Sequence, residues 1–230
     1  MRDVSVQGKT RIKALLQIES GEILKSYFLS FYAKAIKRRL TPTYFIWRAN
    51  GFNAPSPQFI KVKVLKRNGI ANGSWVETGT YLGNTTKYLA RNFPQSQVIS
   101  LEPDKRIYTF TSHRLEKFKN IKFINGSSEL EFDNVLSKLR GPVNFWLDGH
   151  FSGDITFKGD LYSPVIKELE VIEKHLSRLE KVCVLVDDVR DFNDDPTSGY
   201  PSRSYLVDWA NKNNLIWQIE QDIFIAKSKD

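Results

Sequence analysis

The sequence predicts an α/β fold built on a mostly parallel β-sheet, and two features of the chain indicate it. From residue 74 onward, short apolar runs alternate with longer segments that have helical periodicity. The last two apolar runs are separated by only two residues, a gap that fits a β-hairpin. Strict alternation of strands and helices requires right-handed crossovers between parallel strands, whereas a closing hairpin makes the last strand antiparallel.

Seven strands and five helices account for this regular part. The expected strands are residues 74–77, 98–102, 121–124, 143–148, 182–187, 215–220 and 223–226. The expected helices are residues 85–93, 104–119, 128–139, 163–178 and 204–212. Ser163 and Pro164 support the start of the fourth helix as its N-cap and first residue. Cys183 lies in an apolar run and is expected to pack in the core.

The first part of the chain has a different character. Residues 1–70 hold 14 Lys and Arg against 3 Asp and Glu, whereas the other 160 residues hold 20 against 23. The basic charge therefore belongs to an N-terminal segment, which argues against a nucleic-acid-binding protein. Residues 22–40 predict a helix, and the Gly- and Pro-containing residues 48–58 predict a linker. We expect a helical extension over residues 1–58 and a catalytic domain over 59–230, with residues 59–68 forming either a helix or a strand.

Two absences bear on the expected location of the protein. No apolar run approaches the roughly 20 residues that span a bilayer. The residues after Met1 lack the apolar segment of a secretory signal. The sequence therefore predicts a cytoplasmic protein.

The turn after the first expected strand has the spacing Glu77-x-Gly79-x-x-x-Gly83. Gly79 allows a tight turn and a close ligand approach, and Gly83 allows the next helix to pack against the sheet. The spacing differs from the Gly-x-Gly-x-x-Gly fingerprint of dinucleotide sites. A carboxylate two residues before the first glycine would repel a pyrophosphate but suits a cationic amino-acid cofactor, which disfavours an NAD-dependent dehydrogenase.

Polar residues also follow the next two expected strands. Glu102 ends the second strand about 20 residues after the glycine turn, where a carboxylate accepts hydrogen bonds from ribose hydroxyls. Asn125, Gly126 and Ser127 end the third strand, where they are expected to contact an adenine edge. Ligands of parallel sheets bind at this carboxyl edge.

With these motifs, residues 74 to 226 resemble class I S-adenosylmethionine-dependent methyltransferases, which have a Rossmann-like fold. Glu77-Thr78-Gly79-Thr80, Leu147-Asp148-Gly149-His150 and Val186-Asp187-Asp188 are similar to segments of the bacterial macrocin-type sugar O-methyltransferases. The resemblance implies S-adenosylmethionine as cofactor, with Glu77, Thr78, Gly79, Gly83, Glu102, Asn125, Gly126, Ser127 and Asp148 around it. It also implies metal dependence.

The sequence indicates a metal site independently of the resemblance. Asp148 ends the fourth strand, Asp187 and Asp188 end the fifth, and these strands are expected to be neighbours about 5 Å apart. Three converging carboxylates repel one another unless a cation lies between them. Hard oxygen ligands suit Mg²⁺, with Ca²⁺ or Mn²⁺ as alternatives. In a competing interpretation Asp188 caps a turn and points away.

The loop after Asp148 supplies a second candidate for catalysis. His150 could accept a hydroxyl proton near neutral pH beside Asp148, although a histidine in a surface loop commonly has no catalytic role. Residues 151–160 contain hinge-like glycines and form either a lid over the substrate or an ordinary loop.

The expected function is methyl transfer to a hydroxyl of a sugar or small polyol, assisted by a divalent metal. The acceptor is a small molecule or a glycan that the sequence does not identify. The alternatives are hydroxylase-like chemistry on the same scaffold and a non-catalytic protein in glycan or natural-product assembly, because one fold hosts many functions. No two-His-one-carboxylate set supports a hydroxylase.

The aromatic and basic helix at residues 22–40 leaves two interpretations open. Such a helix can lie on an anionic membrane surface, which would make the protein membrane-peripheral. Its aromatic face can instead pack on the catalytic domain or form a homo-oligomer contact.

Overall fold

The computed structural model describes residues 43–49, 51, 55–148, 163–193 and 199–229. The expected helix at 22–40, His150 and the loop 151–160 lie outside these residues. The chain divides between Gly51 and Phe52, so helix α3 (Thr43–Ala49) stands by itself and everything below concerns the second unit. No helix in the described ranges is long and apolar enough to cross a membrane.

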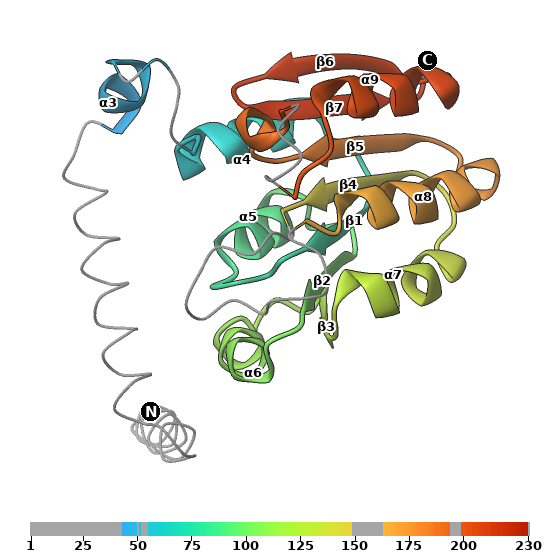
Figure 1. Cartoon of the computed structure of the whole chain (residues 1–230). Coiled ribbons are helices and arrows are strands. Elements are labelled where there is room, and N and C mark those ends of the chain that lie inside the picture. Colours follow the sequence, from blue (N-terminus) through green and yellow to red (C-terminus); the bar gives the residue numbers. More distant parts are fainter. Residues whose placement is uncertain (1–42, 50, 52–54, 149–162, 194–198, 230) are drawn as a thin grey trace, which may run out of the picture. The chain divides into compact units, whose positions relative to one another are not determined.

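A seven-stranded sheet forms the centre of the second unit (Figure 1). Its strands lie in the order β3-β2-β1-β4-β5-β7-β6, and only β7 runs antiparallel to its neighbours. The expected mostly parallel sheet with an antiparallel last strand is confirmed. The strands are β1 (Ser74–Thr78), β2 (Val98–Glu102), β3 (Ile121–Asn125), β4 (Val143–Leu147), β5 (Val182–Val186), β6 (Ile216–Glu220) and β7 (Ile223–Lys227).

Helices cover both faces of this sheet. In chain order they are α4 (Gln58–Asn68), α5 (Asn84–Asn92), α6 (Lys105–Arg114), α7 (Ser128–Ser137), α8 (Val165–His175) and α9 (Arg203–Lys212). Short 3₁₀ turns follow α8 at Leu176–Arg178 and β5 at Val189–Asp191. Residues 59–68, for which periodicity left helix and strand open, belong to helix α4.

Three expected helices are shorter than their apolar patterns suggest. The helix expected over 104–119 begins after its N-cap Asp104 and ends at Arg114, where a turn at Leu115 leads toward β3. The helix expected over 128–139 ends at Ser137. The helix expected from residue 163 begins at Val165, and its last three residues form the 3₁₀ turn instead of α-helix. Helix ends commonly tighten in this way.

Alternate side chains of the central strands build two separate hydrophobic cores. On one face, Val76, Phe145 and Val184 pack with apolar residues of α7, α8 and α9. On the other face, Trp75 and Cys183 pack with residues of α4 and α5. Cys183 is fully buried there, which confirms its expected place in the core. Parallel strands covered on both faces are apolar throughout, and this is why their runs were visible in the sequence.

Gly83 fixes how closely the first turn of α5 approaches α6. Its φ angle is +62°, in the left-handed region that favours glycine. A Cβ atom at this position would lie 2.6 Å from Thr111 Cγ2 and 2.8 Å from Leu115 Cδ1. Gly83 thus permits close packing through its backbone angle and the space around it, but the packing is against α6 and Leu115 and not, as expected, against the sheet.

We expect Gly83→Ala to destabilise the protein by about 2–4 kcal/mol, through left-handed strain and overpacking together. Gly141→Ala is the matched control, because Gly141 has a φ of +72° but nothing within 4 Å of an added Cβ. Urea unfolding of both variants measures the difference. Equal destabilisation of the two variants would show that α6 shifts to accommodate the added Cβ. Close packing would then not explain why glycine is needed at position 83.

Candidate functional site at the carboxyl edge of the sheet

The acidic residues singled out in the sequence gather at one edge of the sheet. Strand β1 pairs with β2 on one side and β4 on the other, so the direction of the crossovers reverses at β1. Glu77 and Glu102 lie at the carboxyl ends of β1 and β2, and Asp148 directly follows β4. Open parallel sheets bind ligands at this reversal point.

Glu102 is held rigidly at the end of β2. The backbone amide of Tyr81 donates to its Oε2 at 2.8 Å, and the amide of Asp104 donates to its Oε1 at 3.0 Å. Burial raises the pKa of this carboxyl, and the two amides partly oppose the rise. Each carboxylate oxygen can accept a further hydrogen bond. The arrangement presents an oriented acceptor next to the turn at Gly79, where φ is +84°.

Glu77 lies in β1, two residues before Gly79, and is almost completely buried. The hydroxyl groups of Thr86 and Ser100 donate to its Oε2 at 2.5 Å and 2.6 Å. Burial raises the pKa of Glu77 to about 7, although these two hydroxyls favour its charged form. These hydrogen bonds therefore join the end of β1 to α5 and β2. The expected contact of Glu77 with the amino-acid end of a cofactor remains a prediction.

The segment after β3 braces the end of β2. Asn125 Nδ2 donates to the carbonyl oxygens of Glu102 at 2.8 Å and Pro103 at 3.2 Å. The amide of Gly126 also donates to the Glu102 carbonyl, at 3.1 Å. Ser127 is the N-cap residue of α7, but its side chain makes no capping hydrogen bond. The adenine contact expected of these residues stays a prediction, and the Asn125 amide already has two protein acceptors.

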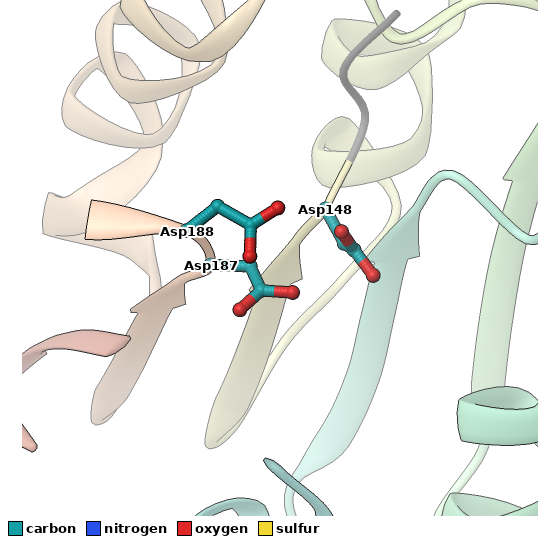
Figure 2. A group of neighbouring side chains, drawn as sticks. All are labelled: Asp148, Asp187 and Asp188. Atoms are coloured by element: carbon teal, nitrogen blue, oxygen red, sulfur yellow. The ribbon is translucent and has the colours of Figure 1, made fainter. Parts of the chain in front are cut away.

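Asp148, Asp187 and Asp188 meet at the ends of the neighbouring strands β4 and β5. One carboxylate oxygen of each residue lies within 4.8 Å of the other two, and Figure 2 shows the three side chains gathered together. Asp188 does begin a turn, with a φ of +57°, but its side chain makes no capping hydrogen bond. The alternative in which Asp188 points away from the other two is therefore wrong.

Two protein cations already contact this acidic cluster. Lys61 of α4 forms an ion pair with Asp187 Oδ2 and lies 3.3 Å from Asp188 Oδ1. Arg190 Nη1 lies 2.7 Å from the same Asp188 oxygen and also pairs with Asp222. Three converging carboxylates predicted a cation here, and in the structure Lys61 lies against two of them.

Lys61 was missed because it precedes the region that carries the motifs. A signal for it exists: Lys61 is buried on the same helix face as Val64, Leu65 and Asn68. A lysine on the buried face of a helix needs a carboxylate partner, because an unpaired buried charge is costly. Periodicity shows such a lysine but cannot show its partners, which lie 126 and 127 residues away.

The cluster remains electrostatically strained despite these cations. Burial raises the pKa values of both Asp148 and Asp187, with further contributions from neighbouring carboxylates, whereas Lys61 opposes the rise. Asp187 Oδ1 is buried and has no hydrogen-bond donor among the described residues. A buried carboxylate oxygen without a donor fits a divalent cation, because the cation would bind the deprotonated carboxylates and offset their mutual repulsion.

A further buried acid, Glu168 of α8, was not predicted from the sequence. It lies near the hydroxyls of Ser128 and Thr78, and burial raises its pKa to about 7. No donor within the described ranges contacts its Oε1. Its position on the apolar face of α8, next to Val165, Leu169 and Ile172, was the available signal.

The pKa of Glu168 predicts a change of stability with pH. Because the folded pKa near 7 exceeds the unfolded value of 4.5, folding retains a proton, and stability falls as pH rises between these values. We expect Glu168→Gln to be more stable than wild type at pH 8, by up to roughly 3 kcal/mol at 1.36 kcal/mol per unit. The advantage should largely disappear near pH 5.

Urea unfolding at several pH values tests this, with Glu170→Gln on the exposed face of α8 as control. A Glu168→Gln variant whose stability relative to wild type does not change with pH would show that Glu168 does not hold a proton in the folded protein.

Comparison with known proteins identifies the fold. No protein-family model and no curated protein matches the chain. Among solved structures, a Staphylococcus aureus protein described as a caffeoyl-CoA O-methyltransferase is similar over 88% of this chain and 100% of its own, with 15% identity and a TM-score of 0.51. The chain has the Rossmann-like methyltransferase fold.

Other solved structures are similar at lower TM-scores. A methyltransferase from Geobacter sulfurreducens has 11% identity and a TM-score of 0.49, and the match covers 81% of this chain and 86% of the other. Fibrillarin from Aeropyrum pernix, solved with natively bound S-adenosyl-L-methionine, has 10% identity and a TM-score of 0.46, with 74% of each chain covered. Within the methyltransferase fold, the antiparallel β7 and the acids at the ends of β1 and β2 occupy the places that the sequence predicted.

Proposed function

We propose that the protein is an S-adenosylmethionine-dependent O-methyltransferase that acts on a hydroxyl of a sugar or small polyol, with help from a divalent cation. The observation that carries this proposal is the Glu102 carboxylate, oriented by two backbone amides beside the Gly79 turn. A carboxylate fixed in this way is suited to the two hydroxyls of a ribose. Glu102 ends β2, next to the strand β1 at which the crossovers reverse, and this position supports a ligand site there.

The acidic character of the edge supports the choice of cofactor. Glu77, Glu102 and Asp148 end three adjacent strands, an environment that favours a ligand with positive charge. S-adenosylmethionine carries an ammonium and a sulfonium, and when bound it supplies a methyl group as the electrophile. In this proposal Glu102 binds the ribose, and Glu77 with Thr78 and Gly79 shapes the turn that receives the amino-acid end. Asn125, Gly126 and Ser127 lie next to the adenine.

The acid cluster supports the second component, a divalent cation. Asp148, Asp187 and Asp188 would hold it through carboxylate oxygens, of which Asp187 Oδ1 has no donor in the described part of the chain. Mg²⁺ suits these ligands best, with Ca²⁺ and Mn²⁺ as alternatives. When bound, the cation supplies Lewis acidity that lowers the pKa of a hydroxyl near it.

A side chain of the protein must remove the proton from the hydroxyl that accepts the methyl group. An acceptor oxygen that gains a methyl group must lose its proton, and a general base works best when its pKa lies near the working pH. Asp148, which follows β4 at this edge of the sheet, is one candidate base. His150, two residues further on, is the other candidate base.

The acceptor class follows from the resemblance to macrocin-type enzymes. It is tested by incubating the protein with S-adenosylmethionine bearing an isotopically labelled methyl group and panels of free sugars, nucleotide sugars and lipid-linked glycans. We expect label on a hydroxyl oxygen of one panel, with Mg²⁺ required. Transfer to nitrogen or carbon would contradict the acceptor class, and full turnover in excess chelator would contradict the metal.

A further inference from the structure

Lys61 occupies one side of the acid cluster in the structure. It lies on the buried face of α4, and its side chain is only 10% exposed. Its ammonium group contacts Asp187 Oδ2 and lies 3.3 Å from Asp188 Oδ1. Both residues belong to the proposed metal-ligand set, so Lys61 and a divalent cation would draw on the same carboxylates.

Among the described residues, Arg190 is the second cation that contacts the cluster, and it has further partners. Arg190 contacts Asp188 but also pairs with Asp222 through Nη1 and with Asp191 through Nη2. In contrast, the ion pairs described for Lys61 are those with Asp187 and Asp188. Arg190 therefore has anchors outside the cluster, whereas the flexible Lys61 side chain is held by the cluster itself.

The local charge would balance a divalent ion, but that ion and the present Lys61 contact draw on the same Asp187 and Asp188 carboxylates. Asp148, Asp187, Asp188 and Asp222 carry four negative charges in their ionised forms, against two positive charges on Lys61 and Arg190. Divalent cations bind carboxylate oxygens at roughly 2.0–2.6 Å, so an ion among three oxygens that lie within 4.8 Å of one another would be close to the Lys61 ammonium. Two cations at that separation repel each other strongly in a buried site.

We propose that Lys61 is a built-in competitor of the divalent cation, and that metal binding displaces its ammonium from Asp187. The inference rests on the proposed metal site and adds a residue that sets its affinity. In the absence of metal, Lys61 neutralises part of the cluster and keeps the carboxylates together. On metal binding, Lys61 leaves Asp187 and becomes more accessible, so the first turns of α4 respond to metal occupancy.

Removing the charge should therefore tighten metal binding. We expect Lys61→Gln in the full chain to bind Mn²⁺ at least about 10-fold more tightly than wild type in calorimetry without cofactor, equivalent to about 1.4 kcal/mol. Lys66→Gln is the matched control, because Lys66 is an exposed lysine of the same helix. Its Mn²⁺ affinity should equal that of wild type, which excludes a general effect of net charge.

A second measurement needs no variant and stays informative if Lys61→Gln does not fold. Wild-type protein is treated with an amine-reactive reagent with and without saturating Mn²⁺, and modification of Lys61 and Lys66 is quantified by mass spectrometry. We expect Mn²⁺ to increase modification of Lys61 several-fold and to leave Lys66 unchanged. Unchanged or decreased modification of Lys61 on Mn²⁺ binding would overturn displacement.

The outcomes separate this inference from the proposed function. Equal Mn²⁺ affinity of wild type and Lys61→Gln, or weaker binding by the variant, would overturn the role of Lys61 and leave the metal site standing. Binding by Lys61→Gln but not by wild type would support the inference in its strongest form. Absence of binding to both would overturn the metal site together with the inference, whereas S-adenosylmethionine titrated into the same samples reports on the cofactor site independently.

Discussion

Replacing Glu102 with alanine is expected to weaken S-adenosylmethionine binding by about 10- to 150-fold while the fold survives. The range corresponds to the roughly 1.5–3 kcal/mol lost with a hydrogen bond to a charged group. The carboxylate is oriented by the amides of Tyr81 and Asp104, so its acceptor geometry exists before ligand binds. Calorimetry measures the affinity, and thermal unfolding confirms that the variant is folded.

Glu116→Ala serves as the control for Glu102→Ala. Glu116 is an exposed glutamate after α6, in the turn that leads toward β3, and its side chain is 68% exposed. Its removal changes the net charge by the same amount and should leave the affinity unchanged. A folded Glu102→Ala variant that binds S-adenosylmethionine as tightly as wild type would contradict the proposed contact between Glu102 and the ribose.

Replacing Asp187 with asparagine is expected to abolish metal-dependent activity and to weaken divalent-cation binding by more than about 100-fold. Loss of an outer partner of a metal site alone costs about 10- to 100-fold, and a direct charged ligand contributes more. Asparagine keeps the size of the buried side chain, which limits the packing cost. S-adenosylmethionine affinity should stay nearly intact, because Asp187 belongs to the proposed metal-ligand set and not to the proposed cofactor set.

Asp191→Asn is the matched control for Asp187→Asn. Asp191 lies four residues further on and pairs with Arg190 Nη2 at 3.2 Å, but it is not part of the three-carboxylate cluster. Titration of Mn²⁺ into both variants compares their affinities, and the activity assay is run with and without chelator. Equal Mn²⁺ affinity in Asp187→Asn and wild type would contradict the ligand assignment.

The strands were predictable because parallel strands buried on both faces need continuous apolar runs. The run at Val182–Val186 is entirely buried in the structure, and the acids that follow it had to emerge at the carboxyl edge. The same logic brought Asp148 near Asp187, because adjacency of β4 and β5 follows from the crossover rules. Local pattern and topology together were sufficient for this part of the site.

Long-range side-chain contacts were not predictable in the same way. The ion pair between Lys61 and Asp187 joins residues 126 positions apart, and no periodicity encodes that distance. The two hydroxyls that hold Glu77 likewise come from Thr86 and Ser100 on different elements. The early end of α6 at Arg114 depends on tertiary packing of Leu115, which overrides the helical pattern that continues in the sequence.

Calorimetric titration of S-adenosylmethionine into the unmodified 230-residue chain, with and without Mg²⁺, tests the central claim most directly. We expect saturable binding at one site per chain, present in both conditions, because Glu102 and the Gly79 turn are fixed by the protein itself. Absence of S-adenosylmethionine binding in both conditions, to a protein shown to be folded, would contradict it.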